Sequence, residues 1–138
     1  MHKSNRGFTL IEIMIVIAII GIVITIGYPS LTEYMKKARR TEIASLLSEQ
    51  AQILERYYSR NNAYTNAYTN ATGLSTGNDS YTIAPTTLTD QSFILKAVRR
   101  SGSPMAADKC GDFVITNTGV RNVENAAAGV TAKDCWGR

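Results

Sequence analysis

The most constraining feature of this sequence is an apolar run from Phe8 to Tyr28, about 21 residues long, with Glu12 as its single charge. At 1.5 Å rise per residue, a helix of this length spans roughly 30 Å, the thickness of the hydrocarbon core of a bilayer. We therefore expect one membrane-spanning helix over residues 8–28.

Glu12 lies near the start of this run, where a carboxylate costs about 2.5–3.5 kcal/mol on insertion scales. No cation lies between Leu10 and Ile20. Cleavage after Gly7 would create an α-amino group on Phe8, one helical turn from Glu12. An ammonium about 4 Å from a carboxylate gains on the order of 4 kcal/mol at an effective dielectric of 20. We expect this amine, from the same chain or a neighbour, to be the partner of Glu12.

The junction before the run reads Gly-Phe-Thr-Leu-Ile-Glu at positions 7–12 and comes after a short basic leader. This N-terminus resembles that of type IV prepilins and type II secretion pseudopilins. An ordinary secretory signal has a shorter apolar stretch with its cleavage site after it, whereas the candidate site here lies before it. The resemblance implies a leader peptide over 1–7, cleavage between Gly7 and Phe8 by a prepilin peptidase, N-methylation of Phe8, and an assembly role for Glu12.

Length and charge fit a small exported domain on a membrane stalk. The chain has 138 residues, and the leader and span leave about 110 for one domain with a modest core. The formal net charge is +4, with a pI of about 9.2. Lys3 and Arg6 leave with the leader, so the remainder is about +2, too little to argue nucleic-acid binding. The resemblance implies a single-pass protein of the bacterial inner membrane, with its leader in the cytoplasm, that later enters a pilus fibre on the cell surface.

Beyond the apolar run, hydrophobic residues recur at three- and four-residue steps, which predicts an amphipathic helix over about 30–60. These positions are Leu31, Met35, Ala38, Ile43, Leu46, Leu47, Ala51, Leu54, Tyr57 and Tyr58. Pro29 lacks an amide hydrogen, and Gly21 and Gly27 weaken the turns before it, so we expect a kink or local melting between Gly21 and Pro29. The sequence thus predicts one long bent helix whose apolar stripe must be covered by later segments of the chain.

An Asn- and Gly-rich segment over 61–80 predicts a loop. The tetrapeptide Ala-Tyr-Thr-Asn occurs twice in it, at 63–66 and 67–70, and two copies are too few for a repeat fold. We interpret them as a local duplication within the loop.

After this loop the hydrophobic period changes to two. The pattern predicts antiparallel strands over 81–84, 92–99 and 112–116, with a possible fourth over 120–123. One face of this sheet would bury the helix stripe. The expected fold class is α+β: a long N-terminal helix, half transmembrane and half amphipathic, packed on a small antiparallel sheet within a globular domain over 29–138.

The two cysteines, Cys110 and Cys135, bracket the last predicted strand. In an exported domain an even count indicates a disulfide, which would close the C-terminal region 81–138. A redox-active pair is the alternative, but no C-x-x-C motif is present, and the single histidine, His2, lies in the leader, which leaves no structural zinc site. Closing a loop of about 25 residues stabilises the fold by about 3.5 kcal/mol in the chain-entropy model.

The C-terminal half narrows the resemblance. It contains Glu-Arg-Tyr-Tyr-Ser at 55–59, Asp-Lys-Cys-Gly at 108–111 and Asp-Cys-Trp at 134–136, and in these it resembles PilE-type minor pilins with the pilin fold. The resemblance implies a structural subunit of a type IV pilus. Its implied partners are other pilin subunits, the prepilin peptidase, an inner-membrane assembly platform with a cytoplasmic ATPase, and membrane lipid before assembly. A major pilin, a type II secretion pseudopilin and a DNA-uptake receptor pilin remain alternatives.

No catalytic constellation is found in the sequence. Residues 8–138 contain no histidine, no Gly-rich phosphate loop, and no serine or cysteine beside a base. The acidic pairs Asp108/Asp112 and Asp79/Asp90 lack the dense spacing of a calcium loop. We therefore expect no enzyme activity, no metal and no cofactor.

Two arginine pairs stand out in the globular part, Arg39-Arg40 and Arg99-Arg100. We expect them to be solvated or to pair with Glu33 and Glu42 of neighbouring subunits. A contact with DNA is the alternative interpretation.

Overall fold

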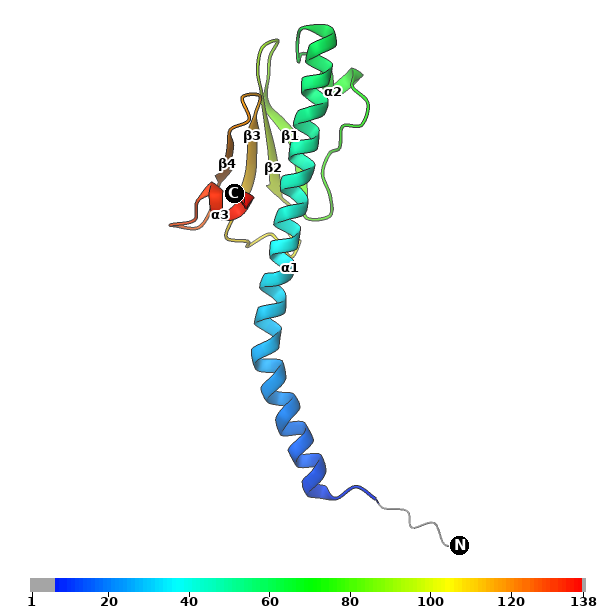
Figure 1. Cartoon of the computed structure of the whole chain (residues 1–138), viewed down its shortest axis with the longest axis vertical. Coiled ribbons are helices and arrows are strands. Elements are labelled where there is room, and N and C mark those ends of the chain that lie inside the picture. Colours follow the sequence, from blue (N-terminus) through cyan, green and yellow to red (C-terminus); the bar gives the residue numbers. More distant parts are fainter. Residues whose placement is uncertain (1–6, 138) are drawn as a thin grey trace, which may run out of the picture. The chain divides into compact units, whose positions relative to one another are not determined.

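The computed structural model describes residues 7–137, and Figure 1 labels its elements. These residues form two units, the first ending at Met35 and the second beginning at Lys36. Helix α1, Leu10–Asn61, contributes to both units. We describe each unit by itself.

The first unit consists mainly of the N-terminal part of α1, whose apolar side chains are exposed along its length. Among the described residues, α1 is the one helix long and apolar enough to cross a membrane, judged by length and composition. The expectation between Gly21 and Pro29 is a kink or local melting. α1 continues as helix through Pro29, which excludes melting, and the kink stays a prediction. The hydroxyl of Thr25 donates to the carbonyl of Ile22 at 2.8 Å.

The second unit packs the rest of α1 on a four-stranded sheet (Figure 1). The strands are arranged as an antiparallel meander, in the order β1-β2-β3-β4. Its elements are α2 (Ala67–Asn70), β1 (Tyr81–Leu88), β2 (Phe93–Arg99), β3 (Asp112–Thr116), β4 (Arg121–Glu124) and α3 (Ala132–Trp136). The predicted α+β class is confirmed, since a long N-terminal helix covers a small antiparallel sheet and a disulfide closes the C-terminal region.

The core lies between α1 and one face of the sheet. It comprises Ile43, Leu47 and Leu54 of α1 with inward-facing strand residues such as Phe93, Leu95 and Phe113. The predicted stripe is correct from Ile43 onward and wrong at its start, because Leu31 is 59% exposed and Met35 is 50% exposed. Gln50 and Ile53, which the pattern assigned to no stripe, are buried instead.

Strand β1 is longer than predicted. The sequence indicated a break at Pro85, but the strand continues to Leu88, with a register shift between Pro85 and Thr87. Proline cannot donate to a strand ladder and is tolerated on edge strands and at bulges. β1 is an edge strand, so the proline costs it no central hydrogen bond.

The loop after α1 is more ordered than its composition indicates. Tyr64 stacks on Tyr58, with ring centroids 4.5 Å apart, and meets Phe93 edge-on at 5.0 Å. Its hydroxyl donates to Glu55 at 2.8 Å. The second copy of the tetrapeptide forms the short helix α2, so the two copies differ in conformation.

The C-terminal segment returns to the sheet through a disulfide and a tryptophan. Cys110 and Cys135 are bonded, with their Cα atoms 5.7 Å apart. The indole nitrogen of Trp136 donates to the carbonyl of Asn122 on β4 at 2.9 Å, and its ring lies 5.4 Å from that of Phe113. Helix α3 therefore lies against the free edge of β4.

Candidate functional site

The candidate processing junction lies directly before α1. Gly7, Phe8 and Thr9 form no regular structure, and Phe8 is 80% exposed. The remainder of the predicted leader, including Lys3 and Arg6, lies outside the described residues. The expected cleavage bond between Gly7 and Phe8 thus lies outside the hydrogen-bonded helix.

Thr9 and Glu12 form a reciprocal cap at the start of α1. The amide of Thr9 donates to the carboxylate of Glu12 at 3.4 Å, and the amide of Glu12 donates to the hydroxyl of Thr9 at 3.3 Å. This is a capping box, in which each side chain satisfies a backbone amide that the helix leaves without a partner. The negative charge also lies at the positive end of the helix dipole.

This partner of Glu12 was not predicted from the sequence. The signal was present as Thr-Leu-Ile-Glu at positions 9–12, since a Ser or Thr with a Glu three residues later, before an apolar run, predicts a capping box. The amine on Phe8 expected as partner would exist only after cleavage. In the full-length chain the carboxylate bonds to the amide of Thr9 instead.

The glycines of the predicted helix break have open surroundings. A Cβ atom added at Gly21 or Gly27 would meet nothing within 4 Å. Packing within the described chain therefore requires neither glycine.

The environment of Arg40 contradicts the expectation that the arginine pairs are solvated. It is buried, and its guanidinium donates to Asp108 through Nε at 2.9 Å and through Nη2 at 2.5 Å. Asp108 also accepts from the amide of Cys110 at 3.1 Å. Burial by itself would raise the pKa of Asp108, but the bonds from Arg40 and from the Cys110 amide outweigh it and lower the pKa. The pair ties α1 to the segment that carries the disulfide.

Arg99 is likewise engaged within the chain. Its Nε donates to Asp112 at 3.2 Å, and its Nη1 donates to the carbonyl of Asp108 at 3.0 Å. Lys96 bonds Glu124 at 2.7 Å and lies 3.8 Å from Asp112. Burial would raise the pKa of Asp112, but hydrogen bonds from Asn125 and from Arg99 lower it.

The other member of each arginine pair also has an internal partner. Arg39 donates to the hydroxyl of Ser80 at 2.8 Å, and Arg100 donates to the carbonyl of Asn78 at 2.8 Å. The expectation that these arginines are solvated or bound to neighbouring subunits is therefore wrong for Arg40 and Arg99, and incomplete for Arg39 and Arg100.

The described residues contain no group of three or more His, Cys, Asp or Glu side chains that could hold a metal ion. The acidic residues Asp108 and Asp112 are occupied by arginines. The candidate functional features of the described residues are the junction, the exposed apolar part of α1 and the disulfide-closed C-terminal region.

Two family models match the chain. One is described as "Type IV minor pilin ComP, DNA uptake sequence receptor" and matches residues 29–114. The other is described as "Prokaryotic N-terminal methylation motif" and matches residues 2–28. Together they cover the junction, the apolar run and most of the second unit.

Curated relatives match over shorter stretches. The "Type IV wide pilus major component PilA4" of Thermus thermophilus is 40% identical over 63 residues, which are 46% of this chain and 48% of that protein. The "Type IV major pilin protein PilE1" of Neisseria gonorrhoeae is 40% identical over 58 residues, which are 42% of this chain and 35% of that protein. The chain thus spans less than half the length of these curated relatives.

Solved structures share the fold. A type IV pilin from Shewanella oneidensis is 32% identical, with a TM-score of 0.51 over 62% of this chain and 89% of that chain. The non-core minor pilin PilV of Neisseria meningitidis has a TM-score of 0.56 over 68% of this chain and 93% of that chain. At 20% identity, the similarity to PilV concerns the fold alone.

Proposed function

This chain belongs to the type IV pilin family, and we propose that it is a minor pilin, a structural subunit that enters a type IV pilus through its N-terminal helix. The family and the fold are those of structural, non-enzymatic proteins. Its partners are other pilin subunits.

The observation that carries the proposal is the exposed apolar surface of α1. Side chains such as Ile11, Ile19 and Ile26 are between 56% and 70% exposed, so the described residues leave most of their surface uncovered. Membrane lipid can cover such a helix before assembly, and apolar helices of neighbouring subunits can cover it afterwards. Glu12 at its start gives the helix a fixed charge by which an incoming subunit is brought into register.

Processing at the junction belongs to the same proposal. A prepilin peptidase cuts between Gly7 and Phe8, and Phe8 is then N-methylated, as the methylation-motif match to residues 2–28 supports. Before assembly the chain is a single-pass protein of the inner membrane, where the assembly platform receives it. Gly21, Gly27 and Pro29 supply a segment of α1 that can yield when subunits pack.

A minor role is supported by the description of the family model over residues 29–114. The PilE relatives are named major pilins, so similarity to PilE-type chains does not itself favour a minor role. The abundance of this chain in the pilus distinguishes a minor from a major pilin. We expect this chain to be a small fraction of the protein in sheared pili, and a chain that dominates the filament would be a major pilin.

The same preparation tests processing. Intact-mass measurement of the pilus-associated chain should give a polypeptide that begins at Phe8 and carries one added methyl group. A Gly7→Leu variant should stay full-length in the membrane and be absent from pili, because the peptidase must approach the backbone at Gly7 closely. Recovery of the chain in secretion-system fractions and not in pili would favour a pseudopilin.

A DNA-uptake receptor is the second candidate, favoured by the words "DNA uptake sequence receptor" in the description of the matching family model. Lys37, Lys109 and Lys133 are exposed cations that could contact phosphates. The test is a gel-shift titration of the detergent-solubilised full chain with short DNA duplexes at several salt concentrations. A receptor should bind one sequence preferentially, with affinity that falls as salt rises.

A further inference from the structure

The end of α1 and the segment that includes the end of α2 line an open hollow of about 670 Å³. Its lining residues are Ile53, Arg56, Tyr57, Arg60, Asn61, Asn70, Ala71 and Thr72. This volume falls within the range of small-ligand sites. None of the functional features described above uses it.

Two arginines give the hollow its charge. Arg56 and Arg60 lie one helical turn apart on α1, and both are exposed. No carboxylate lies within ion-pair distance of either guanidinium among the described residues, in contrast to Arg40 and Arg99. Guanidinium groups free to make charge-assisted bonds favour an anion, and a carboxylate or phosphate can be held by two parallel bonds.

The remaining lining is polar at the rim and apolar at the base. Asn61, Asn70 and Thr72 are exposed and offer amide and hydroxyl groups that both donate and accept. Ile53 is buried beneath them, and the half-buried ring of Tyr57 offers a flat apolar wall. Such a lining suits a ligand that has one anionic group, several hydroxyls and an apolar ring face.

We propose that this hollow binds a sugar residue that carries one carboxylate, the terminal unit of an acidic surface glycan. Arg56 and Arg60 hold the carboxylate, the amides and hydroxyl at the rim bind the ring hydroxyls, and Tyr57 contacts the ring face. The pilin domain would then carry a receptor site as well as its structural role. The site does not depend on whether the pilin is minor or major.

A DNA duplex fits the hollow less well. Arg56 and Arg60 are its two cationic lining residues, whereas duplex binding rests on many phosphate contacts along a groove or ridge. The volume of the hollow matches a small ligand such as a single sugar residue, whereas a duplex needs a longer cationic surface. The carboxylate of an unrelated acidic protein would leave the amides and hydroxyl at the rim unused.

The test is a titration of the ¹⁵N-labelled full chain in detergent micelles, monitored by the backbone amide shifts of Asn70, Ala71 and Thr72. Methyl glucuronide is the probe, and methyl glucoside, in which a neutral hydroxymethyl group replaces the carboxylate, is its matched control. We expect saturable shifts with the glucuronide and binding at least about tenfold weaker with the glucoside.

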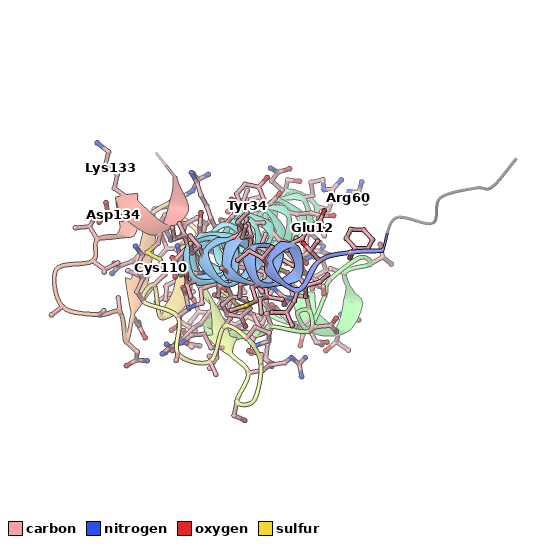
Figure 2. The ribbon with its side chains drawn as sticks, turned by 90° about the horizontal axis from the view of Figure 1, so that it is seen from below. Glu12, Tyr34, Arg60, Cys110, Lys133 and Asp134 are labelled. Carbon is pink, nitrogen blue, oxygen red and sulfur yellow. A yellow bond between two sulfur atoms is a disulfide. The ribbon has the colours of Figure 1, made fainter. Side chains whose placement is uncertain are left out.

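Three variants accompany the titration. Arg56→Gln and Arg60→Gln should each weaken glucuronide binding by about tenfold or more, and Lys133→Gln should leave it unchanged. Lys133 and Arg60 lie on opposite sides of the view in Figure 2, so the control removes one positive charge far from the hollow. Unshifted amide signals elsewhere in each variant verify the fold.

Several outcomes would overturn the proposal. These are no saturable shift with the glucuronide, equal binding of the glucoside, equal binding of inorganic phosphate, or a short DNA duplex that saturates the same amides at lower concentration. The last outcome would assign the hollow to nucleic acid.

Discussion

Arg40 and Asp108 lie 68 residues apart in the sequence, and their side chains meet in a buried two-bond contact between α1 and the segment before the disulfide. The carboxylate also accepts from the amide of Cys110, so one charged group joins the helix, the segment and the cysteine. Each of the two buried charges has the other as its partner. Removal of either side chain would leave the other charge buried without a counter-ion.

Replacing Arg40 by Met should therefore lower the free energy of unfolding of the pilin domain by about 3–5 kcal/mol, because Asp108 would remain buried without its cation. Denaturant unfolding monitored by circular dichroism measures the change. Lys37→Met is the matched control, since it removes an exposed cation from the same helix and should cost under about 1 kcal/mol. Equal effects of the two variants would show that the pair contributes nothing specific.

Acid should destabilise the domain through Asp108 and Asp112. Both carboxyl groups have pKa values below the ordinary 3.8, because hydrogen bonds from arginines and amides outweigh the effect of burial. The folded state then binds fewer protons than the unfolded state, so this stabilisation is complete above the ordinary pKa and is lost as the pH falls through the lowered values. Melting temperatures measured from pH 6 down to pH 2 should fall most steeply below about pH 4.

The Asp108→Asn variant isolates that contribution. It should be less stable at neutral pH and should lose less of its remaining stability in acid. Asp79→Asn, at an exposed position, serves as the control and should retain the steep acid dependence of the parent. An identical pH dependence in the parent and the Asp108→Asn variant would contradict this account.

Gly111 should tolerate no side chain. Its φ angle is +67°, and an added Cβ would lie 2.1 Å from the carbonyl oxygen of Glu124. Gly111→Ala should therefore cost about 3 kcal/mol or more, from backbone strain and displacement of the neighbouring strand. Gly102→Ala is the matched control, because Gly102 also has a positive φ, +79°, but has nothing within 4 Å of an added Cβ. It should cost about 1 kcal/mol, and chemical denaturation of the two variants measures the difference.

The disulfide should contribute a large part of the stability of the domain. Cys110→Ser should lower the free energy of unfolding by about 2–5 kcal/mol, and Cys135→Ser should have a similar effect because both break the same bond. Calorimetry under non-reducing conditions gives these values. The double variant should cost about as much as either single one, and a cost equal to the sum would mean that the two thiols act independently.

Glu12 has two roles that substitutions can separate. Glu12→Gln removes the charge and keeps an acceptor for the amide of Thr9, whereas Glu12→Val removes both. Membrane insertion of both variants should equal or exceed that of the parent, because the charge is costly in the bilayer. If the charge drives assembly, neither variant should appear in sheared filaments at equal membrane levels.

The companion variant Thr9→Val removes the hydroxyl of the cap and keeps the charge. We expect it to assemble, with helix content at the N-terminus reduced. Filaments that contain Glu12→Gln but lack Glu12→Val and Thr9→Val would assign the assembly role to the cap. The N-terminal mass of each variant must be measured in the same samples, because a failure of cleavage would also prevent assembly.

Local and periodic features of the fold could be predicted from the sequence. The spacing of hydrophobic residues shows which face of a helix or strand is apolar and so is buried in the fold or in a membrane. This holds for the apolar run, the amphipathic repeat and the alternating strands. The disulfide could be inferred from an even cysteine count in an exported domain. The capping box at Thr9 is also local, but a search for charged partners of Glu12 does not find it, because the partner is a backbone amide.

Features that join distant segments could not be predicted. Arg40 lies in a helix whose neighbouring positions are polar, and nothing local distinguishes it from a solvated arginine until the segment with Asp108 packs beside it. The buried stripe of α1 begins later than its pattern, because a sheet covers only the length of helix that it can reach. The hollow beside Arg56 and Arg60 is formed by α1 together with residues 70–72. The amino-acid composition of the loop does not predict this path along the helix.

The bond from Trp136 to the carbonyl of Asn122 limits aggregation of this protein by strand addition. An unpaired sheet edge is a template for strand addition, the mode of growth that leads to amyloid. One edge of this sheet is shielded by the indole and by α3, and the other edge contains Pro85, which has no amide hydrogen to offer an incoming strand. Edge-to-edge strand addition between copies is therefore disfavoured, even at the high local concentration of a fibre. The surface left for association between copies is the exposed apolar side of α1.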